Sequence, residues 1–81
     1  MAIGRIKDLK FEKGFGFISP ETGGKDVFFH KNSLQDFEFS RLQIGMIVEF
    51  EWEKGQRGPR ANFVRCLAHN KQPHEYRFIN P

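Results

Sequence analysis

The sequence has one cysteine, one tryptophan and one tyrosine among its 81 residues, and no long apolar run. With Cys66 alone, no disulfide can form within the chain, which excludes a small secreted domain held together by disulfides. No apolar run approaches the roughly 20 residues that a helix needs to cross a bilayer. Residues 1–5 lack the apolar stretch of a secretory signal. We therefore expect a cytoplasmic protein with no membrane partner.

The chain is also too short for several classes of function. Eighty-one residues make one domain with one modest core, which leaves little room for a buried active-site cleft. Thirteen Lys and Arg residues against ten Asp and Glu residues give a net charge of +3. This excess fits a polyanionic partner without proving one. An enzyme is not expected.

Phenylalanine, in contrast, is abundant, with ten copies. Ten such rings are more than so small a core is expected to hold, so we expect some of them at the surface. An exposed ring on a basic protein needs a physical reason, and stacking against nucleobases is one such reason.

Strand patterns dominate the chain. The five expected strands are Ile3–Leu9, Phe15–Ile18, Asp26–His30, Ile47–Glu53 and Arg60–Leu67. In the fourth, Val48, Phe50 and Trp52 alternate with glutamates, which predicts one buried face and places Trp52 in the core or at its rim. In the fifth, Ala61 and Val64 are expected on opposite sides. Five short strands joined by close turns favour a closed barrel, because closure removes unpaired edges.

The domain organisation is expected to be simple. We predict a barrel domain over residues 1–67 and a C-terminal tail over residues 68–81, either disordered or packed on the barrel. Apolar residues in the tail also make it a possible contact for another protein. Between the third and fourth strands, Asn32 is expected to cap a short helical turn that runs to Asp36.

Strand alternation divides the aromatic side chains into two sets, because successive side chains point to opposite faces. The inward set is expected to be Ile18, Val27 and Phe29. The outward set, which we call the aromatic platform, is expected to be Phe15, Phe17, Phe28 and His30. The cations expected near it are Lys7, Lys10, Lys13, Lys31, Arg57 and Arg60. Rings for bases and cations for phosphates suit an unpaired strand, whereas a duplex hides its base faces.

Two segments carry a family resemblance. Lys13–Ile18, with the sequence KGFGFI, and Val27–His30, with the sequence VFFH, resemble the two ribonucleoprotein-type motifs of bacterial cold-shock proteins and the related cold-shock domain. Gly4 and Gly58–Pro59 match as well, and the resemblance covers roughly Ile3 to Val64. It implies an all-β fold, a five-stranded antiparallel Greek-key OB-fold barrel. It also implies an RNA chaperone that binds single-stranded RNA or DNA and melts weak secondary structure.

The resemblance also implies roles for individual residues. The implied stacking residues are Phe15, Phe17, Phe28, His30 and Phe39. The residues implied near phosphates are Lys7, Lys13 and Arg57, to which the charge pattern adds Lys31 and Arg60. No cofactor and no metal are expected, and we expect a monomer.

The chain departs from the family pattern at two positions. Asp8 stands where a tryptophan is usual, so a stacking ring is missing and a carboxylate lies near the phosphate path. Lys31 stands where many bacterial members have phenylalanine, which exchanges a stack for a cation. We expect weaker binding, by about 1–3 kcal/mol for the change at Asp8, and greater sensitivity to salt.

Two other classes of function remain open. The first is a protein-interaction module, in which the same barrel has lost nucleic-acid affinity through Asp8. The second is a zinc site or metal-dependent hydrolase, with candidate ligands Cys66, His69, His74 and Glu75. Structural zinc usually needs four ligands in tight paired spacing, and only three good ones are offered here. The same residues lack the orienting partner and oxyanion hole of a nucleophilic enzyme.

Overall fold

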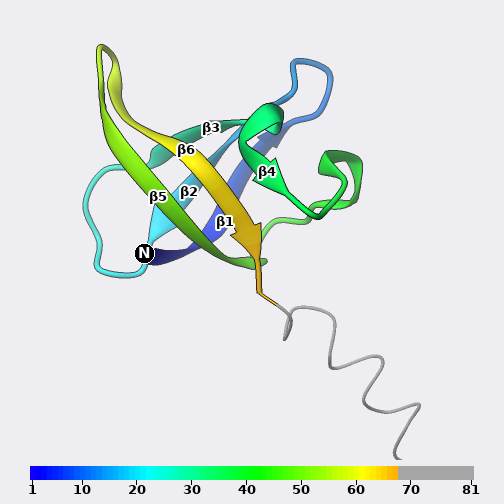
Figure 1. The fold of residues 1–81 in the computed structure, drawn as a ribbon, viewed down its shortest axis with the longest axis horizontal. Helices are drawn as coiled ribbons and strands as arrows, with labels where there is room; N and C mark the ends of the chain where they lie inside the picture. The colour runs from blue at the N-terminus through cyan, green and yellow to red at the C-terminus, as the bar shows by residue number, and fades with distance from the viewer. Residues whose placement is uncertain (68–81) are drawn as a thin grey trace, which may run out of the picture.

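The computed structural model describes residues 1–67, and it shows a closed β-barrel (Figure 1). Its strands are β1 (Ala2–Lys10), β2 (Phe15–Pro20), β3 (Val27–His30), β4 (Leu34–Gln35), β5 (Ile47–Gly55) and β6 (Gly58–Cys66). Two short 3-10 helices, η1 (Lys31–Ser33) and η2 (Phe39–Arg41), flank β4. The predicted tail, residues 68–81, lies outside the described residues. No helix within residues 1–67 is long and apolar enough to span a membrane.

The barrel closes through the pairing of β3 with β6. The strands follow the order β3-β2-β1-β5-β6-β4, and the additional β3–β6 contact joins the sheet to itself. The β3–β6 contact is parallel, as is the contact of β4 with β6, whereas the remaining pairs are antiparallel. The predicted five-stranded barrel is thus confirmed, and the two-residue β4 is an addition along β6.

The interior of the barrel is filled by apolar side chains from every long strand. The buried side chains are Ile6, Ile18, Val27, Phe29, Leu42, Val48, Phe50, Ala61 and Val64. The inward set predicted from strand alternation is therefore confirmed. Gly16 lets β1 pass close to β2, because a Cβ there would lie 2.7 Å from the carbonyl oxygen of Asp8 and 2.9 Å from the Phe29 ring.

A β-bulge in β6 overturns one prediction about the core. Consecutive residues of β5 pair with Phe63 and Ala61, so Asn62 is an extra residue in β6. The bulge shifts the alternation by one position, and Ala61 and Val64 are both fully buried. The expectation that these two side chains lie on opposite sides is therefore wrong.

Trp52 is not a core residue, although it continues the apolar alternation of β5. Val48 and Phe50 are fully buried, whereas Trp52 is 53% exposed. The shift in pairing falls between Glu51 and Trp52. Beyond this point the β5–β6 hairpin projects past the rest of the barrel, at the upper left of Figure 1. The apolar alternation of β5 therefore continues to Trp52, although the core ends at Phe50.

The helical turn after β3 begins earlier than predicted and has a different cap. The imidazole Nδ1 of His30 accepts a hydrogen bond from the backbone N–H of Asn32, at 3.1 Å. Asn32 is therefore inside η1, and the helix ends at Ser33 rather than Asp36. The backbone N–H of Lys31 donates to the carbonyl of Gly14, at 2.8 Å, which ties the start of η1 to the β1–β2 turn.

Candidate nucleic-acid interface

Outward side chains of four neighbouring strands align in two cross-strand rows. The first row is Asp8 of β1, Phe17 of β2, Phe28 of β3 and Arg60 of β6. The second row is Lys10 of β1, Phe15 of β2 and His30 of β3. Side chains directly opposite each other in antiparallel strands lie about 4.5–5.5 Å apart at Cβ, so the neighbours on β1, β2 and β3 within each row are in contact range. The rows form one continuous surface of the barrel.

Three phenylalanine rings in these rows touch one another. The Phe15 and Phe28 centroids are 5.2 Å apart and their rings are tilted by 39°. Phe17 makes edge-to-face contacts with both, at 6.0 Å from Phe15 and 5.8 Å from Phe28. All three rings are partly exposed, whereas Ile18 and Phe29 on the other side of the same strands are buried. The mutual contacts hold the rings in place before any ligand arrives.

His30 completes the second row with a polar group of fixed orientation. Its Nδ1 accepts the hydrogen bond from η1, so in the neutral imidazole the proton is on Nε2. The ring is partly exposed and lies opposite Phe15. His30 therefore offers a donor N–H at the edge of the aromatic platform.

Cations lie at two sides of the platform. The guanidinium of Arg60 lies 5.8 Å from the centroid of the Phe28 ring. At the other side, the aliphatic stem of Lys31 crosses Gly14, with its Cδ 3.1 Å from the position that a Gly14 Cβ would take. Lys13, next to Gly14 in the β1–β2 turn, is exposed. Lys31 thus places a cation at the end of the platform that carries Phe15.

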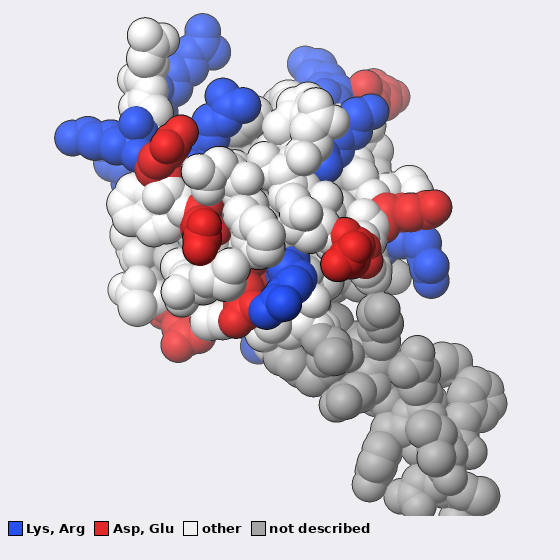
Figure 2. All heavy atoms as spheres, in the orientation of Figure 1, with Lys and Arg blue, Asp and Glu red and all other residues white. Residues whose placement is uncertain are grey.

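Of the remaining predicted cations, Lys7 is paired with a carboxylate and Arg57 lies in a turn. The ammonium of Lys7 lies 3.0 Å from the carboxylate of Asp26, and both side chains are well exposed. Arg57 is exposed in the turn between β5 and β6. Basic side chains gather around the upper-left part of Figure 2, where the tip of this hairpin lies in Figure 1.

Asp8 faces outward because β1 contains a bulge. The pairing with β2 shifts between Ile6 and Asp8, so Lys7 is an extra residue. Ile6 is buried, whereas the Asp8 side chain is 49% exposed. Its Oδ1 accepts from the backbone N–H of Leu9 at 2.9 Å, and its Oδ2 lies 3.6 Å from the Lys10 ammonium. A carboxylate therefore occupies the β1 end of the first row.

Phe39 lies in a second aromatic cluster. Its centroid is 6.2 Å from that of the buried Phe29 and 5.6 Å from that of Phe11, both in edge-to-face contact. Phe39 thus covers part of the core, while Phe11 is 51% exposed. Phe37, the other aromatic side chain of this segment, lies 6.0 Å below the guanidinium of Arg41.

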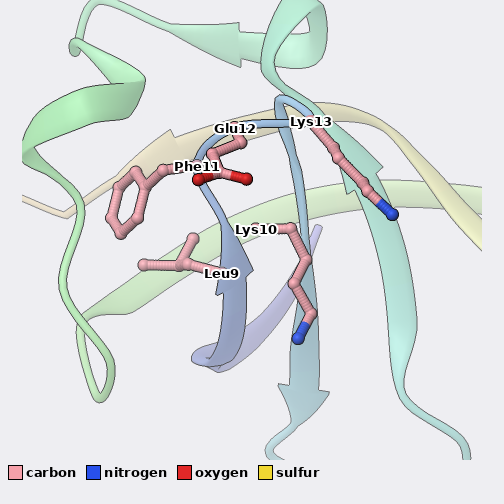
Figure 3. A pocket seen from close by; sticks show the side chains of 5 residues that line it. All are labelled: Leu9, Lys10, Phe11, Glu12 and Lys13. Atoms are coloured by element: carbon pink, nitrogen blue, oxygen red, sulfur yellow. The ribbon is translucent and has the colours of Figure 1, made fainter.

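A hollow of about 320 Å³ adjoins this second cluster and is lined by Leu9 to Lys13, which form the end of β1 and the start of the β1–β2 connection. In Figure 3, the side chains of Leu9 and Phe11 point to one side of this connection, and the amines of Lys10 and Lys13 point to the other. Phe11 is not among the residues predicted from the sequence to contact nucleic acid. The sequence did contain a signal for such a role, because Phe11 is a bulky apolar residue between two strands and a solvated turn does not need one.

The candidate zinc site is not supported by the part of the chain that the structure describes. Residues 1–67 contain no group of three His, Cys, Asp or Glu side chains placed to hold a metal ion. Cys66 is partly exposed at the end of β6, and the other three candidate ligands lie outside the described residues.

Comparison with known proteins identifies the family to which this barrel belongs. The sequence model of the family described as "'Cold-shock' DNA-binding domain" matches residues 2–67. The chain belongs to the cold-shock domain family. This cold-shock domain is 50% identical over 64 residues to the cold shock-like protein CspG of Escherichia coli K12, which covers 79% of this chain and 91% of that protein.

Other relatives give the same result. The domain is 48% identical over 68 residues to the major cold shock protein of Streptococcus pyogenes serotype M6, covering 84% of this chain and all of that protein. Among solved structures, Drosophila Unr CSD456 matches with a TM-score of 0.67 and 26% identity. That match covers 86% of this chain but only 28% of the longer Drosophila chain. The likeness therefore concerns the domain and not the rest of the longer chain.

Proposed function

We propose that this cold-shock domain binds single-stranded RNA or DNA by stacking unpaired bases on the aromatic platform. The observation that carries the proposal is the cluster of Phe15, Phe17 and Phe28, whose rings contact one another outside the core. Each stacked base contributes about 1–3 kcal/mol, and any base can stack because every base has a π face. The description of the matching family as a DNA-binding domain supports the same conclusion.

The remaining binding residues extend this platform. The proposed nucleic-acid-binding set is Lys7, Lys13, Phe15, Phe17, Phe28, His30, Lys31, Phe39, Arg57 and Arg60. The cations neutralise phosphates, and binding releases the counterions that they replace. His30 donates from Nε2 to a base or phosphate, and Phe39 contacts bases that lie beyond the platform. No step in this binding needs a metal, a cofactor or a chemical reaction.

In the cell, such binding acts as RNA chaperoning by mass action. A protein that binds only unpaired strands shifts the equilibrium between paired and unpaired RNA toward the unpaired form. Weak hairpins melt first, because their pairing energy is smallest. We propose that the domain does this as a monomer in the cytoplasm, where its single cysteine remains reduced.

Fluorescence anisotropy with a labelled heptadeoxythymidylate in dilute buffer tests the proposal. Wild-type protein is expected to bind it, and a longer blunt duplex that stays paired in the same buffer is expected to compete poorly. The double variant Phe15→Ala, Phe28→Ala removes two stacking rings and is expected to lose about 2–6 kcal/mol of binding energy. Trp52→Ala is the matched control, because Trp52 is an exposed ring outside the platform. Equal affinity of the double variant and the wild type would contradict the proposal.

One observation favours a second candidate, a protein-interaction module on the same barrel. Asp8 places a carboxylate at the end of an aromatic row, where it repels phosphates and weakens nucleic-acid binding. In that case the exposed rings would serve a protein partner instead. Failure of every single-stranded oligonucleotide to bind at low ionic strength would favour this candidate.

A further inference from the structure

The polar groups in the two rows differ in what they offer to a base edge. Lys10, His30 and Arg60 present N–H donors, with the His30 proton on Nε2 as described above. Asp8 presents acceptor oxygens. It lies directly opposite Phe17, so a base stacked on that ring has a carboxylate at its β1 side.

The Asp8 carboxylate has unused hydrogen-bonding capacity. An ionised carboxylate has about four lone-pair sites on its two oxygens. One site on Oδ1 accepts from the backbone N–H of Leu9, and Oδ2 has the Lys10 ammonium 3.6 Å away, beyond a hydrogen bond. The Leu9 contact orients the side chain, and its 49% exposure leaves the carboxylate accessible to a ligand, with the Lys10 ammonium as an ion-pair neighbour.

Bases differ in how well they fit a fixed carboxylate. Guanine has two adjacent donors, N1–H and the exocyclic N2 amino group, which match the two carboxylate oxygens as a charge-assisted bidentate pair. Uracil and thymine have one N3–H between two carbonyl oxygens, and a carboxylate repels both carbonyls. Adenine and cytosine each offer an amino group beside an acceptor nitrogen, so each can donate one hydrogen bond to the carboxylate but cannot form the bidentate pair.

We propose that Asp8 makes this domain prefer a single strand containing guanine over one containing only thymine or uracil. The preference rests on the proposed function, because the base must first stack on Phe17 for its edge to meet the carboxylate. Asp8 then acts as a specificity-determining residue at a position where the family pattern has a stacking ring.

The test compares three labelled DNA heptamers: all thymidine, thymidine with one central guanine, and thymidine with inosine at the same place. Inosine keeps N1–H and lacks the N2 amino group. One guanine is sufficient, because a short strand can shift its register to place that base on Phe17. Wild-type protein is expected to bind the guanine strand about tenfold more tightly than the all-thymidine strand, with the inosine strand between them.

Two variants separate the role of Asp8 from its charge. Asp8→Asn is expected to bring the ratio of guanine to thymine affinity close to one, since the amide has a single acceptor oxygen. The matched control, Glu51→Gln, removes an exposed carboxylate on a different strand, β5, and is expected to keep the wild-type ratio. Near-ultraviolet circular dichroism checks that both variants are folded.

The outcomes distinguish the two proposals. If no heptamer binds at low ionic strength, the proposed function itself fails. If all three bind equally to wild-type protein, the proposed function stands and the role of Asp8 is overturned. A guanine preference that persists in Asp8→Asn also overturns it, because another group would then be reading the base.

Discussion

Asp8 lies directly opposite Phe17 in the β1–β2 ladder, because Lys7 is an extra residue in β1. The shift turns a carboxylate toward the aromatic platform, although Ile6, two residues earlier, points into the core. The domain therefore has a stacking surface with a negative charge at one end and the Arg60 guanidinium at the other. This arrangement sets its expected affinity, salt dependence and base preference.

Replacing Asp8 with tryptophan is expected to tighten binding to heptadeoxythymidylate. The variant adds a ring next to Phe17 and removes a charge that repels phosphates. The gain is expected to be about 1–3 kcal/mol, the contribution of one further stack. Anisotropy titrations of the variant and the wild type measure it. An unchanged dissociation constant would show that the Asp8 position does not contact the strand.

Replacing Lys31 with alanine is expected to reduce the salt dependence of binding. Each phosphate contact on a single strand contributes about −0.7 to the slope of log K against log salt concentration. Loss of one contact should make the slope less negative by about this amount. Lys54→Ala, an exposed lysine on β5, is the control and is expected to leave the slope unchanged. Equal slopes for Lys31→Ala and the wild type would show that Lys31 does not contact a phosphate.

Phe11 is expected to matter only for longer strands. Its exposed ring lies in the cluster with Phe39 beside the hollow, on the side opposite the amines of Lys10 and Lys13 (Figure 3). Phe11→Ala should therefore weaken binding of a twelve-nucleotide strand by about 1–3 kcal/mol, the contribution of one stack, and leave a three-nucleotide strand unaffected. Calorimetric titrations with both strands measure the difference. A loss of affinity for both lengths would indicate that Phe11 supports the fold or the platform instead.

Gly16 is expected to be essential for the stability of the barrel. A Cβ at this position would lie 2.7 Å from the carbonyl oxygen of Asp8 and 2.9 Å from Phe29, so Gly16→Ala must push β1 away from β2. Overpacking of this kind costs about 1–3 kcal/mol, and backbone atoms leave little room for relaxation. Urea denaturation measures the free energy of unfolding.

Gly24→Ala provides a comparison for Gly16→Ala. Gly24 has no neighbour within 4 Å of an added Cβ, but its φ of +98° disfavours a side chain. Its cost is expected to be about 1–2 kcal/mol from backbone strain alone. Gly16→Ala thus measures the cost of overpacking, and Gly24→Ala measures the cost of backbone strain. A Gly16→Ala protein as stable as the wild type would show that β1 can move away from β2 without loss of stability.

Much of the platform could be predicted from sequence, because strand alternation is a local rule. The alternation in β2 and β3 placed Ile18, Val27 and Phe29 inside, and the structure confirms all three. Phe15, Phe17 and Phe28 are correspondingly partly exposed and in contact with one another. Their role in binding remains a prediction until an oligonucleotide is titrated.

The rule failed wherever a bulge interrupted a strand or the core ended. Asn62 bulges out of β6 and puts both Ala61 and Val64 inside, contrary to simple alternation. Trp52 keeps the apolar pattern of β5 but lies where the hairpin has left the barrel. Neither event has a local signal, because a bulge depends on how one strand pairs with another.

By itself the sequence determined the number of long strands, the inward faces of β2 and β3, and the two motifs that bring aromatic residues together. These follow from side-chain periodicity and turn residues, which act over a few positions along the chain. Only the tertiary structure decided how the strands align across the barrel, that Asp8 and Arg60 end the first aromatic row, and that Phe39 packs with Phe11 and the core. Those relationships join residues far apart in the chain, and they depend on register and barrel closure, which local patterns do not encode.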